Sequence, residues 1–550
     1  NDYTIYIENI PSNQLENWAI VQADRFMSPV LRLFHTELET VYEEKNMSLT
    51  NDGRKANEVM LAALYPNHPY GQQTTLGESE HLKNPSMKNI REFYEKYYVA
   101  NNMAVCLSGD FDFDEAIAII DKHFGKLPDK KLPPFIITPE VPITQPIVKN
   151  VIGLEAENIR VAFRMDLPAN SKEIYVLNML DNILSNGKTG LIDLNLNQQQ
   201  KVYSASGFAY VLCDNSSYIL TGKPKTGQTL DEVKDLLLAQ IELVKQGSFS
   251  DDIMTASINN LRLSEMRQLE SNQARAMMMA NAFMNNIPWN DACKSIEYYS
   301  KITKQDVIDF AKKHFNNNYV VVYKRQGTPD DVEKVNKPAI TPIHVNRDAE
   351  SEFFKKIKNN KVKSIEPVFV DFQKEITFLN YNNVPVLYVQ NKENKIFTIT
   401  FRYKVGELND LRFPIATDYF DYLGTSKYSA EELKEEFYKL ACNLTIRSHD
   451  DNSNIVISGL SDNFEKALSL AMELLTDAQP NKVALENLVS DLLKQRNDAK
   501  SNQQAILNAL RSYSEYGPEL SKYALSETQL NALTDEELIK VVQQYLTYKP

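Results

Sequence analysis

Apolar residues recur at helical spacing in three similar stretches of the chain. The stretches are SMKNIREFYEKYY from Ser86, TKQDVIDFAKKHF from Thr303 and TDEELIKVVQQYL from Thr534. Each begins with a Ser or Thr suited to a helix N-cap, and apolar residues follow at offsets four and seven. This spacing predicts three short amphipathic helices, each capped by its first residue.

The first two stretches are each followed by an apolar, β-branched segment. NNMAVCLSGD follows the first and NNNYVVVYKRQ follows the second, and both have the pattern of a loop leading into a strand. The third stretch reaches Pro550, the last residue, where its strand is expected. We therefore expect repeated α+β domains, the last of them interrupted within its unit.

A second repeat relates the N-terminus to the last third of the chain. IENIPSNQLENWAIVQADRF near the start is similar to ISGLSDNFEKALSLAMELL from Ile457, and each has the pattern of strand, turn and helix. Residues 367–456 precede the later copy and include FLNYNNVPVLYVQN and IFTITFRYKVGEL, alternating strands with an Asn-Asn turn. Almost nothing precedes the first copy, so the first domain is expected to lack its opening strands and helix.

These repeats divide the chain into four segments. Residues 1–132 are expected to form a first domain whose N-terminal part is missing, and residues 133–326 a second domain. Residues 327–366 contain three prolines and many charges, which is typical of a linker. Residues 367–550 are expected to form a third domain whose C-terminal end is missing.

Composition narrows the class of protein. The chain is 43% hydrophobic with a net charge of −13, which fits a globular protein and argues against a nucleic-acid partner. It holds no apolar run long enough to predict a membrane span. Its cysteines are too far apart for a metal knuckle and are interpreted as small buried apolar residues. They are Cys106, Cys213, Cys293 and Cys442.

Two candidate sites are set aside. The segment NGKTG at 186–190 lacks the earlier glycine of a phosphate-binding loop, since Asn182 stands in that place, so we expect a turn there. No two histidines lie three or four residues apart, and neither HExxH nor HxxEH occurs. His68, in NHPYG, is interpreted as a structural turn residue.

The segment FHTELETVYEEKN, residues 34–46, carries four glutamates. On a helical wheel, Glu39 and Glu43 fall opposite the apolar arc and are expected to face solvent. Glu37 and Glu44 fall together at the edge of that arc, two turns apart. A partly buried carboxylate needs a compensating partner, and an ion pair with Arg or Lys explains this pair as well as a metal ion does.

Several motifs in order resemble the insulinase/pitrilysin family of zinc metallopeptidases, the inverzincins. They are FHTELETVYEEKN, the following LYPNHPYGQQTTLGESEHLKNPSMKNIREFYEKYYVANNMAVCLSGDFD, and DYTIYIENIPSNQLENW near the start. The resemblance covers almost the whole chain. It implies α+β domains, each an antiparallel or mixed sheet with helices on one face, in a clamshell hinged at 327–366. It also implies a catalytic-type first domain, with 133–326 and 367–550 as non-catalytic repeats.

In this family, two histidines of HxxEH and a downstream glutamate bind zinc, and the glutamate of HxxEH is the general base. The resemblance assigns Glu44 as the zinc ligand and Glu37 as its supporting carboxylate. It assigns no catalytic residue to this chain, because HxxEH is expected upstream of Asn1. Glu44 corresponds in the third domain to Leu493, Lys494 or Gln495, none of them a plausible ligand.

The family also has an Arg–Tyr pair, seven residues apart, that binds substrate. Tyr203 lies in a similar stretch, but Leu196 stands where arginine is required, so the second domain is not expected to carry that pair.

The sequence therefore predicts a zinc-dependent metalloendopeptidase that degrades peptides or unfolded polypeptides in a clamshell chamber. This chain alone is expected to be inactive. A non-catalytic peptide-binding or assembly subunit is the alternative, and a companion chain supplying HxxEH is a third possibility. The Asn- and Lys-rich composition favours a bacterial protein, exported to the periplasm rather than cytoplasmic.

Overall fold

The computed structural model describes residues 2–83, 85–329, 342 and 344–550. The chain divides into two compact units, described separately here. Unit 1 comprises Asn1–Val141, Ser271–Ala292 and Asp331–Asp371, and unit 2 comprises Pro142–Glu270, Cys293–Asp330 and Phe372–Pro550. The four-segment division made from the sequence stays a prediction. Part of its linker, residues 330–341 and 343, lies outside the described residues.

Within its described residues, unit 1 forms helices and irregular segments but no strand. Helices α1 and α7 pack through an apolar cluster that includes Ala19, Phe26 and Phe124. The helices are α1 (Leu15–Met27), α2 (Phe34–Leu49), α3 (Asp52–Leu64), α4 (Pro69–Gln72), α5 (Ser79–Lys83), α6 (Met87–Tyr97), α7 (Phe113–Phe124), α11 (Asn272–Met284), α12 (Trp289–Ala292) and α15 (Glu352–Lys358).

Two strands predicted in unit 1 are not formed. Residues 2–11 and 103–108 both have extended, apolar sequences, but neither pairs as a strand in the structure. A strand is stable only when a neighbour accepts its backbone hydrogen bonds, and the described part of unit 1 holds no strand. The prediction was wrong because local pattern does not supply that neighbour.

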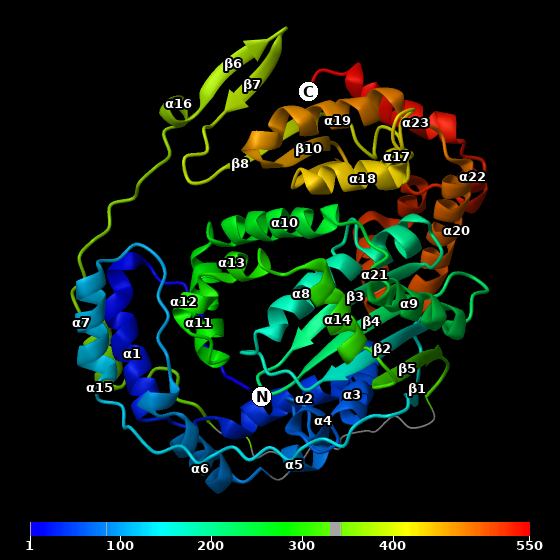
Figure 1. The fold of residues 1–550 in the computed structure, drawn as a ribbon. Helices are drawn as coiled ribbons and strands as arrows, with labels where there is room; N and C mark the ends of the chain where they lie inside the picture. Colours follow the sequence, from blue (N-terminus) through cyan, green and yellow to red (C-terminus); the bar gives the residue numbers. More distant parts are fainter. Residues whose placement is uncertain (1, 84, 330–341, 343) are drawn as a thin grey trace. The chain divides into compact units, whose positions relative to one another are not determined.

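The first half of unit 2 contains a mixed five-stranded sheet of order β1-β5-β2-β4-β3 (Figure 1). β5 runs parallel to β1 and antiparallel to β2, and α8, α9 and α14 pack against the sheet. The elements are β1 (Ile147–Gly153), β2 (Asn158–Met165), α8 (Glu173–Leu184), β3 (Ser204–Val211), β4 (Ser216–Lys223), α9 (Leu230–Lys245), α10 (Asp252–Gln268), α13 (Ser295–Tyr299), α14 (Lys304–His314) and β5 (Tyr319–Gln326). We call these elements repeat A.

The second half of unit 2 is built on the same plan with a smaller sheet, β8-β10-β9. A separate hairpin, β6-β7, precedes it. The elements are α16 (Phe372–Glu375), β6 (Thr377–Tyr381), β7 (Val384–Tyr388), β8 (Ile396–Tyr403), α17 (Phe413–Phe420), α18 (Ala430–Lys439), β9 (Cys442–Ser448), β10 (Ser453–Leu460), α19 (Phe464–Asp477), α20 (Lys482–Asp498), α21 (Gln503–Tyr516), α22 (Glu527–Asn531) and α23 (Asp535–Gln543). We call these elements repeat B.

The predicted helix caps are confirmed. Ser86, Thr303 and Thr534 each accept a hydrogen bond from the backbone N–H three residues ahead, at the start of α6, α14 and α23. The predicted Asn-Asn turn is also confirmed. Asn382 and Asn383 both have positive φ, 50° and 64°, which is the backbone of the turn that joins β6 to β7.

The prediction of buried cysteines was wrong for most of them. Cys442 is buried, Cys106 and Cys213 are half-buried, and Cys293 is exposed. Cys293 directly follows the short helix α12 and is the first residue of a unit 2 segment, and the apolar character of a cysteine alone could not reveal its exposure.

Candidate metal centre

Helix α2 presents one face to an apolar cluster. Leu38 and Tyr42 are buried on that face and contact Phe34, Leu49 and Leu82. Lys45, one turn beyond Tyr42 on the same helix, is also buried. The predicted apolar arc of this helix is therefore formed in the structure.

The exposure of the glutamates of α2 differs from the helical-wheel prediction. Glu37, Glu43 and Glu44 are exposed, and Glu39 is half-buried and has an interaction partner. The expected burial of Glu37 and Glu44 is therefore wrong, and so is the fully solvated setting of Glu39. Position on the wheel fixes which side a residue faces, whereas burial depends on what packs against that side.

Glu37 and Glu44 lie about 10 Å apart along the helix axis. Neither side-chain carboxylate makes a hydrogen bond or an ion pair with a described residue. Glu44 borders a shallow depression of about 480 Å³, whose other lining residues are Met47, Ser48, Asn51, Arg54 and Leu76. From the sequence, an ion pair with Arg or Lys was one possible explanation for these two carboxylates. Within residues 2–83, 85–329, 342 and 344–550, neither carboxylate forms such a pair.

A zinc ion needs three or four converging protein ligands. Across the described residues, no three His, Cys, Asp or Glu side chains come together in a way that could hold a metal ion. Glu44 offers one carboxylate of the right chemistry, but the donors present do not complete a zinc site.

A larger groove lies in unit 2. Its volume is 1420 Å³, and it is lined by the loop after β4, by α20 and by the segment that joins α22 to α23. Two lysines that line it are paired, since Lys225 bonds Asp491 at 3.0 Å and Lys494 bonds Asp498 at 2.6 Å. Lys494 is one of the residues that correspond to Glu44, and as a paired cation it is no metal ligand.

The turn at 186–190 is held by a carboxylate. Asp193 Oδ2 accepts hydrogen bonds from the backbone N–H groups of Asn186, Gly187 and Gly190 at 2.8, 2.9 and 3.1 Å. Those N–H groups would have to face a phosphate in a phosphate-binding loop. The turn predicted from the sequence is therefore present, and its donors are used internally.

His68 also has a structural role. It is buried, and its Nδ1 accepts a hydrogen bond from the Tyr70 N–H at 3.2 Å, which caps α4. Its ring packs on that of Tyr70. This agrees with the interpretation of His68 as a turn residue.

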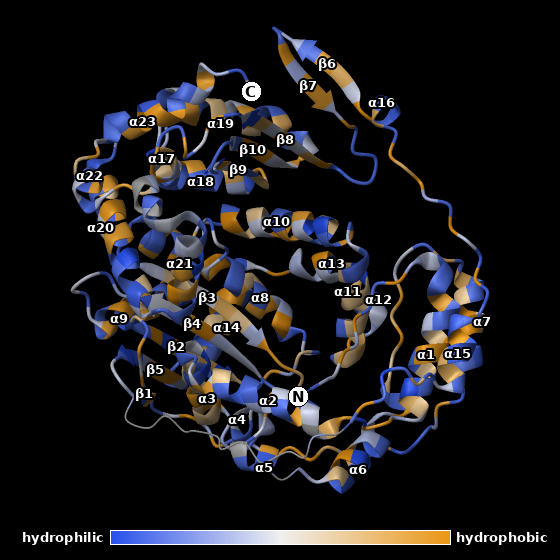
Figure 2. Cartoon of the chain, turned by 180° about the vertical axis from the view of Figure 1, so that it is seen from behind, coloured by the Kyte–Doolittle hydropathy of each residue, from blue (hydrophilic) through white to orange (hydrophobic). Residues whose placement is uncertain are grey.

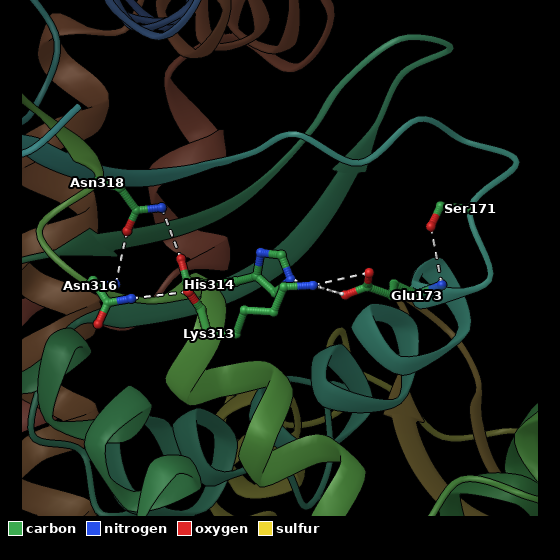
Figure 3. A network of polar contacts seen from close by, with 6 residues as sticks. All are labelled: Ser171, Glu173, Lys313, His314, Asn316 and Asn318. Atoms are coloured by element: carbon green, nitrogen blue, oxygen red, sulfur yellow. Dashed lines mark hydrogen bonds and ion pairs between the residues drawn. The ribbon is translucent and has the colours of Figure 1, made fainter. Parts of the chain in front are cut away.

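A charged cluster that the sequence analysis did not single out joins α8 to the end of α14 (Figure 3). Glu173 accepts from Lys313 Nζ at 2.8 Å and lies 3.1 Å from His314 Nε2. The hydrogen bond from Lys313 lowers the pKa of Glu173, and burial lowers the pKa of His314. Asn318 donates to the carbonyl oxygens of His314 and Arg164 and so ties the start of β5 to this corner. The cluster holds helices together, since Glu173 is already paired.

A buried carboxyl lies beneath the same sheet. Burial raises the pKa of Asp181, on α8, to about 7, and the neighbouring Tyr218 hydroxyl opposes part of that rise. Burial also raises the pKa of Tyr218, which is fully buried on β4. These two groups lie within the core of repeat A and face no groove described above.

Residues 86–261 match the family description "Peptidase M16 inactive domain". The zinc protease PqqE of Helicobacter pylori is 22% identical over 262 residues, 46% of this chain and 57% of that protein. Protease 3 of Escherichia coli K12 is 27% identical over 207 residues, 36% of this chain and 21% of that protein. The crystal structure of pitrilysin matches with a TM-score of 0.54 at 15% identity, covering 98% of this chain and 64% of that chain.

The structure has the α+β fold of pitrilysin-type proteins. The match of residues 86–261 and the curated relatives, both of them proteases, support the insulinase/pitrilysin family, the M16 peptidases. The chain spans 57% of the length of one of the curated relatives and 21% of the other. In the described part of the chain, no helix is long and apolar enough to cross a membrane.

Proposed function

We propose that this chain serves zinc-dependent peptide hydrolysis in a clamshell peptidase, with Glu44 as one zinc ligand and Glu37 as its supporting carboxylate. The observation that carries the proposal is that both side chains are exposed on one helix and uncommitted to any described residue. An uncommitted carboxylate is available to a metal ion, whereas a paired one is not. The names of the two relatives, both proteases, support the reaction class.

HxxEH does not occur in these 550 residues. We therefore assign the two histidine ligands and the general base to polypeptide outside this sequence, from the same protein or from a companion chain. The proposed substrate is a peptide or an unfolded polypeptide, and the proposed setting is a bacterial, exported enzyme. The 550 residues alone are expected to hydrolyse no peptide and to bind zinc weakly.

The first test is made on the coding sequence that precedes Asn1, where we expect HxxEH. In the protein that carries this motif, Glu44→Gln should abolish stoichiometric zinc, measured by elemental analysis, together with hydrolysis of a quenched peptide. Glu37→Gln should lower zinc affinity about 10–100-fold, the range found for outer-shell partners. Glu43→Gln is the matched control, because Glu43 is exposed on the same helix and has no assigned role.

Two results would overturn this assignment. One is tight stoichiometric zinc in the purified 550-residue chain with no other polypeptide present. The other is full zinc occupancy in the complete protein carrying Glu44→Gln.

A non-catalytic peptide-binding or assembly subunit is the second candidate. It is favoured by the match of 86–261 to a family description that carries the word inactive. In that case the coding sequence before Asn1 has no HxxEH, and Glu37 and Glu44 pair with cations of a partner protein. Peptide binding without hydrolysis, unaffected by a zinc chelator, is the expected result.

A further inference from the structure

Residues 353–365, FFKKIKNNKVKSI, are strongly basic. They contain five lysines and no acidic residue, whereas the whole chain has a net charge of −13. They belong to unit 1, and all of them except the half-buried Ile357 are exposed. We call them the basic segment. A linker needs no charge of one sign, so the predicted linker role does not explain this composition.

Two of the five lysines have acidic partners. Lys355 Nζ bonds Glu352 at 2.8 Å, and Lys358 Nζ bonds Glu350 at 3.1 Å. The other three side chains make neither a hydrogen bond nor an ion pair with a described residue, and they are those of Lys356, Lys361 and Lys363. Three exposed positive charges are therefore available to an anionic partner.

The backbone of the basic segment is attached to the first helices of unit 1. Asn13 Nδ2 donates to the Lys363 carbonyl at 2.8 Å, and Asn360 Nδ2 donates to Asn17 Oδ1 at 2.6 Å. The first half of the segment lies in α15, whose N-cap is Ser351, and α15 lies beside α1 and α7 (Figure 1 and Figure 2). The lysines are thus presented from a backbone that has a defined position on this unit.

Bulky apolar side chains accompany these lysines. Phe354 is 51% exposed and Ile365 is 50% exposed. The chain that follows, between α15 and α16, continues with hydrophobic residues (Figure 2), of which Val368 is 96% and Phe369 83% exposed. Exposed apolar side chains gathered in one stretch indicate a surface that contacts another protein or a membrane.

An anionic lipid surface matches both features of this stretch. Lysines are attracted to anionic headgroups, and aromatic and aliphatic side chains insert at the boundary between headgroups and acyl chains. An acidic polypeptide would neutralise the lysines but would leave Phe354, Val368 and Phe369 in water. A bilayer therefore accounts for the charge and for the apolar exposure together.

We propose that residues 353–369 form a peripheral membrane-binding site that recognises the anionic headgroups of a lipid bilayer. The three unpaired lysines contact the headgroups, and Phe354, Val368 and Phe369 insert beside them. The inference goes beyond the proposed peptidase function, since it uses no residue of α2 and needs no zinc ion.

The test measures co-sedimentation of the full 550-residue chain with vesicles of phosphatidylcholine, alone or mixed with phosphatidylglycerol. Binding is expected only to the mixed vesicles and should decline as salt is raised, because salt screens the attraction. The triple variant Lys356→Gln/Lys361→Gln/Lys363→Gln should bind at least about tenfold more weakly, since each lysine near an anionic surface contributes about fivefold. Phe369→Ser should also weaken binding about tenfold, because one inserted ring is lost.

The matched control removes the same amount of charge from exposed lysines of unit 2, in the variant Lys392→Gln/Lys404→Gln/Lys466→Gln. It should bind the mixed vesicles as the wild type does. Equal binding by the two triple variants would overturn the proposal, because net charge alone would then explain the attraction. So would a wild-type chain that stays in solution with the mixed vesicles, or one that binds polyglutamate but no vesicle, which would indicate an acidic polypeptide as the partner.

Discussion

Repeats A and B show how much of a sheet is decided by its neighbours rather than by its own sequence. β2 and β8 have the same register against their partners and the same serine hydrogen bond at one end. They differ because β5 covers one side of β2, while no described strand covers the matching side of β8. Equivalent residues in two similar ladders therefore occupy different environments.

Phe163 and Phe401 are such a pair. Phe163 is almost fully buried and packs on Phe315 and Tyr319, which come from the end of α14 and the start of β5. Phe401 is only half-buried. The difference teaches that β5 contributes to the core of repeat A as well as to its hydrogen-bond ladder.

The largest expected effect is that of Phe163→Ala, which should lower the local free energy of unfolding of repeat A by about 3–5 kcal/mol, since it removes a buried ring and leaves a cavity. Phe401→Ala should cost repeat B about 1–2 kcal/mol, because less area leaves the core. Hydrogen exchange at increasing urea, followed in peptides from β2 and β8, measures each repeat separately. Equal losses would show that β5 is not the source of the difference.

The next effect concerns a buried carboxyl of repeat A, Asp181. The pKa of Asp181 is raised to about 7 by burial, above the value of about 4 in an unfolded chain. The folded state then binds more protons between these values, so the contribution of Asp181 to stability falls as pH rises from about 4 to about 7. Asp181→Asn should therefore stabilise repeat A at pH 8, on the order of 2 kcal/mol, and much less at pH 5.

Repeat B has carboxyls of its own at Asp418 and Asp421, whose pKa values desolvation raises. Asp181→Asn leaves them unchanged, so hydrogen exchange at increasing urea, at pH 5 and at pH 8, should show the stabilisation in peptides of repeat A and not in those of repeat B. Asp235→Asn, at an exposed carboxylate on α9, is the control, and a similar stabilisation there would contradict the assignment to burial.

The helix caps and turns of both repeats could be predicted from the sequence. The elements that pack against or pair with a given segment could not. N-caps and the Asn-Asn turn depend on a few adjacent residues, so Thr303, Thr534 and Asn382 were read correctly. The extended segments at 2–11 and 103–108 were misread as strands, because pairing needs a partner remote in the sequence.

The candidate metal site shows the same limit. The apolar arc of α2 followed from periodicity, and Leu38 and Tyr42 are buried as expected. The predicted burial of Glu37 and Glu44 was wrong, because no described residue packs over that edge of the helix and both side chains are exposed. Their assignment as zinc ligand and support rests on the family resemblance and stays a proposal.

A smaller effect should be the same in both repeats. Ser216→Ala and Ser453→Ala each leave a carbonyl, that of Leu167 or Val405, without its hydroxyl donor. Loss of a buried hydrogen bond of this kind costs about 1–2 kcal/mol. Exchange protection should fall by similar amounts in the two sheets. Unequal losses, by more than about 1 kcal/mol, would mean that the shared register does not give the two hydroxyls equivalent roles.

The smallest effect is expected at the corner where Glu173 joins Lys313 and His314. In repeat B, Tyr545 stacks on Phe413 at the start of α17. Glu173 and Lys313 are both well exposed, so solvent weakens their pairing and Glu173→Gln should cost repeat A only about 0.5 kcal/mol at pH 7. Because pairing lowers the pKa of Glu173, this contribution is present above the pKa of an unfolded glutamate and disappears as pH falls through the folded value.

The lowered pKa of His314 acts in the same direction, since the unfolded chain takes up a proton near pH 6.5 that the folded chain resists. Acidification from pH 7 should therefore destabilise repeat A through His314 first and through Glu173 at lower pH. His314→Gln should remove the loss near pH 6 and leave the later one, as followed by melting between pH 7 and pH 4. A melting profile of this variant that still falls near pH 6 would place the titrating group elsewhere in the repeat.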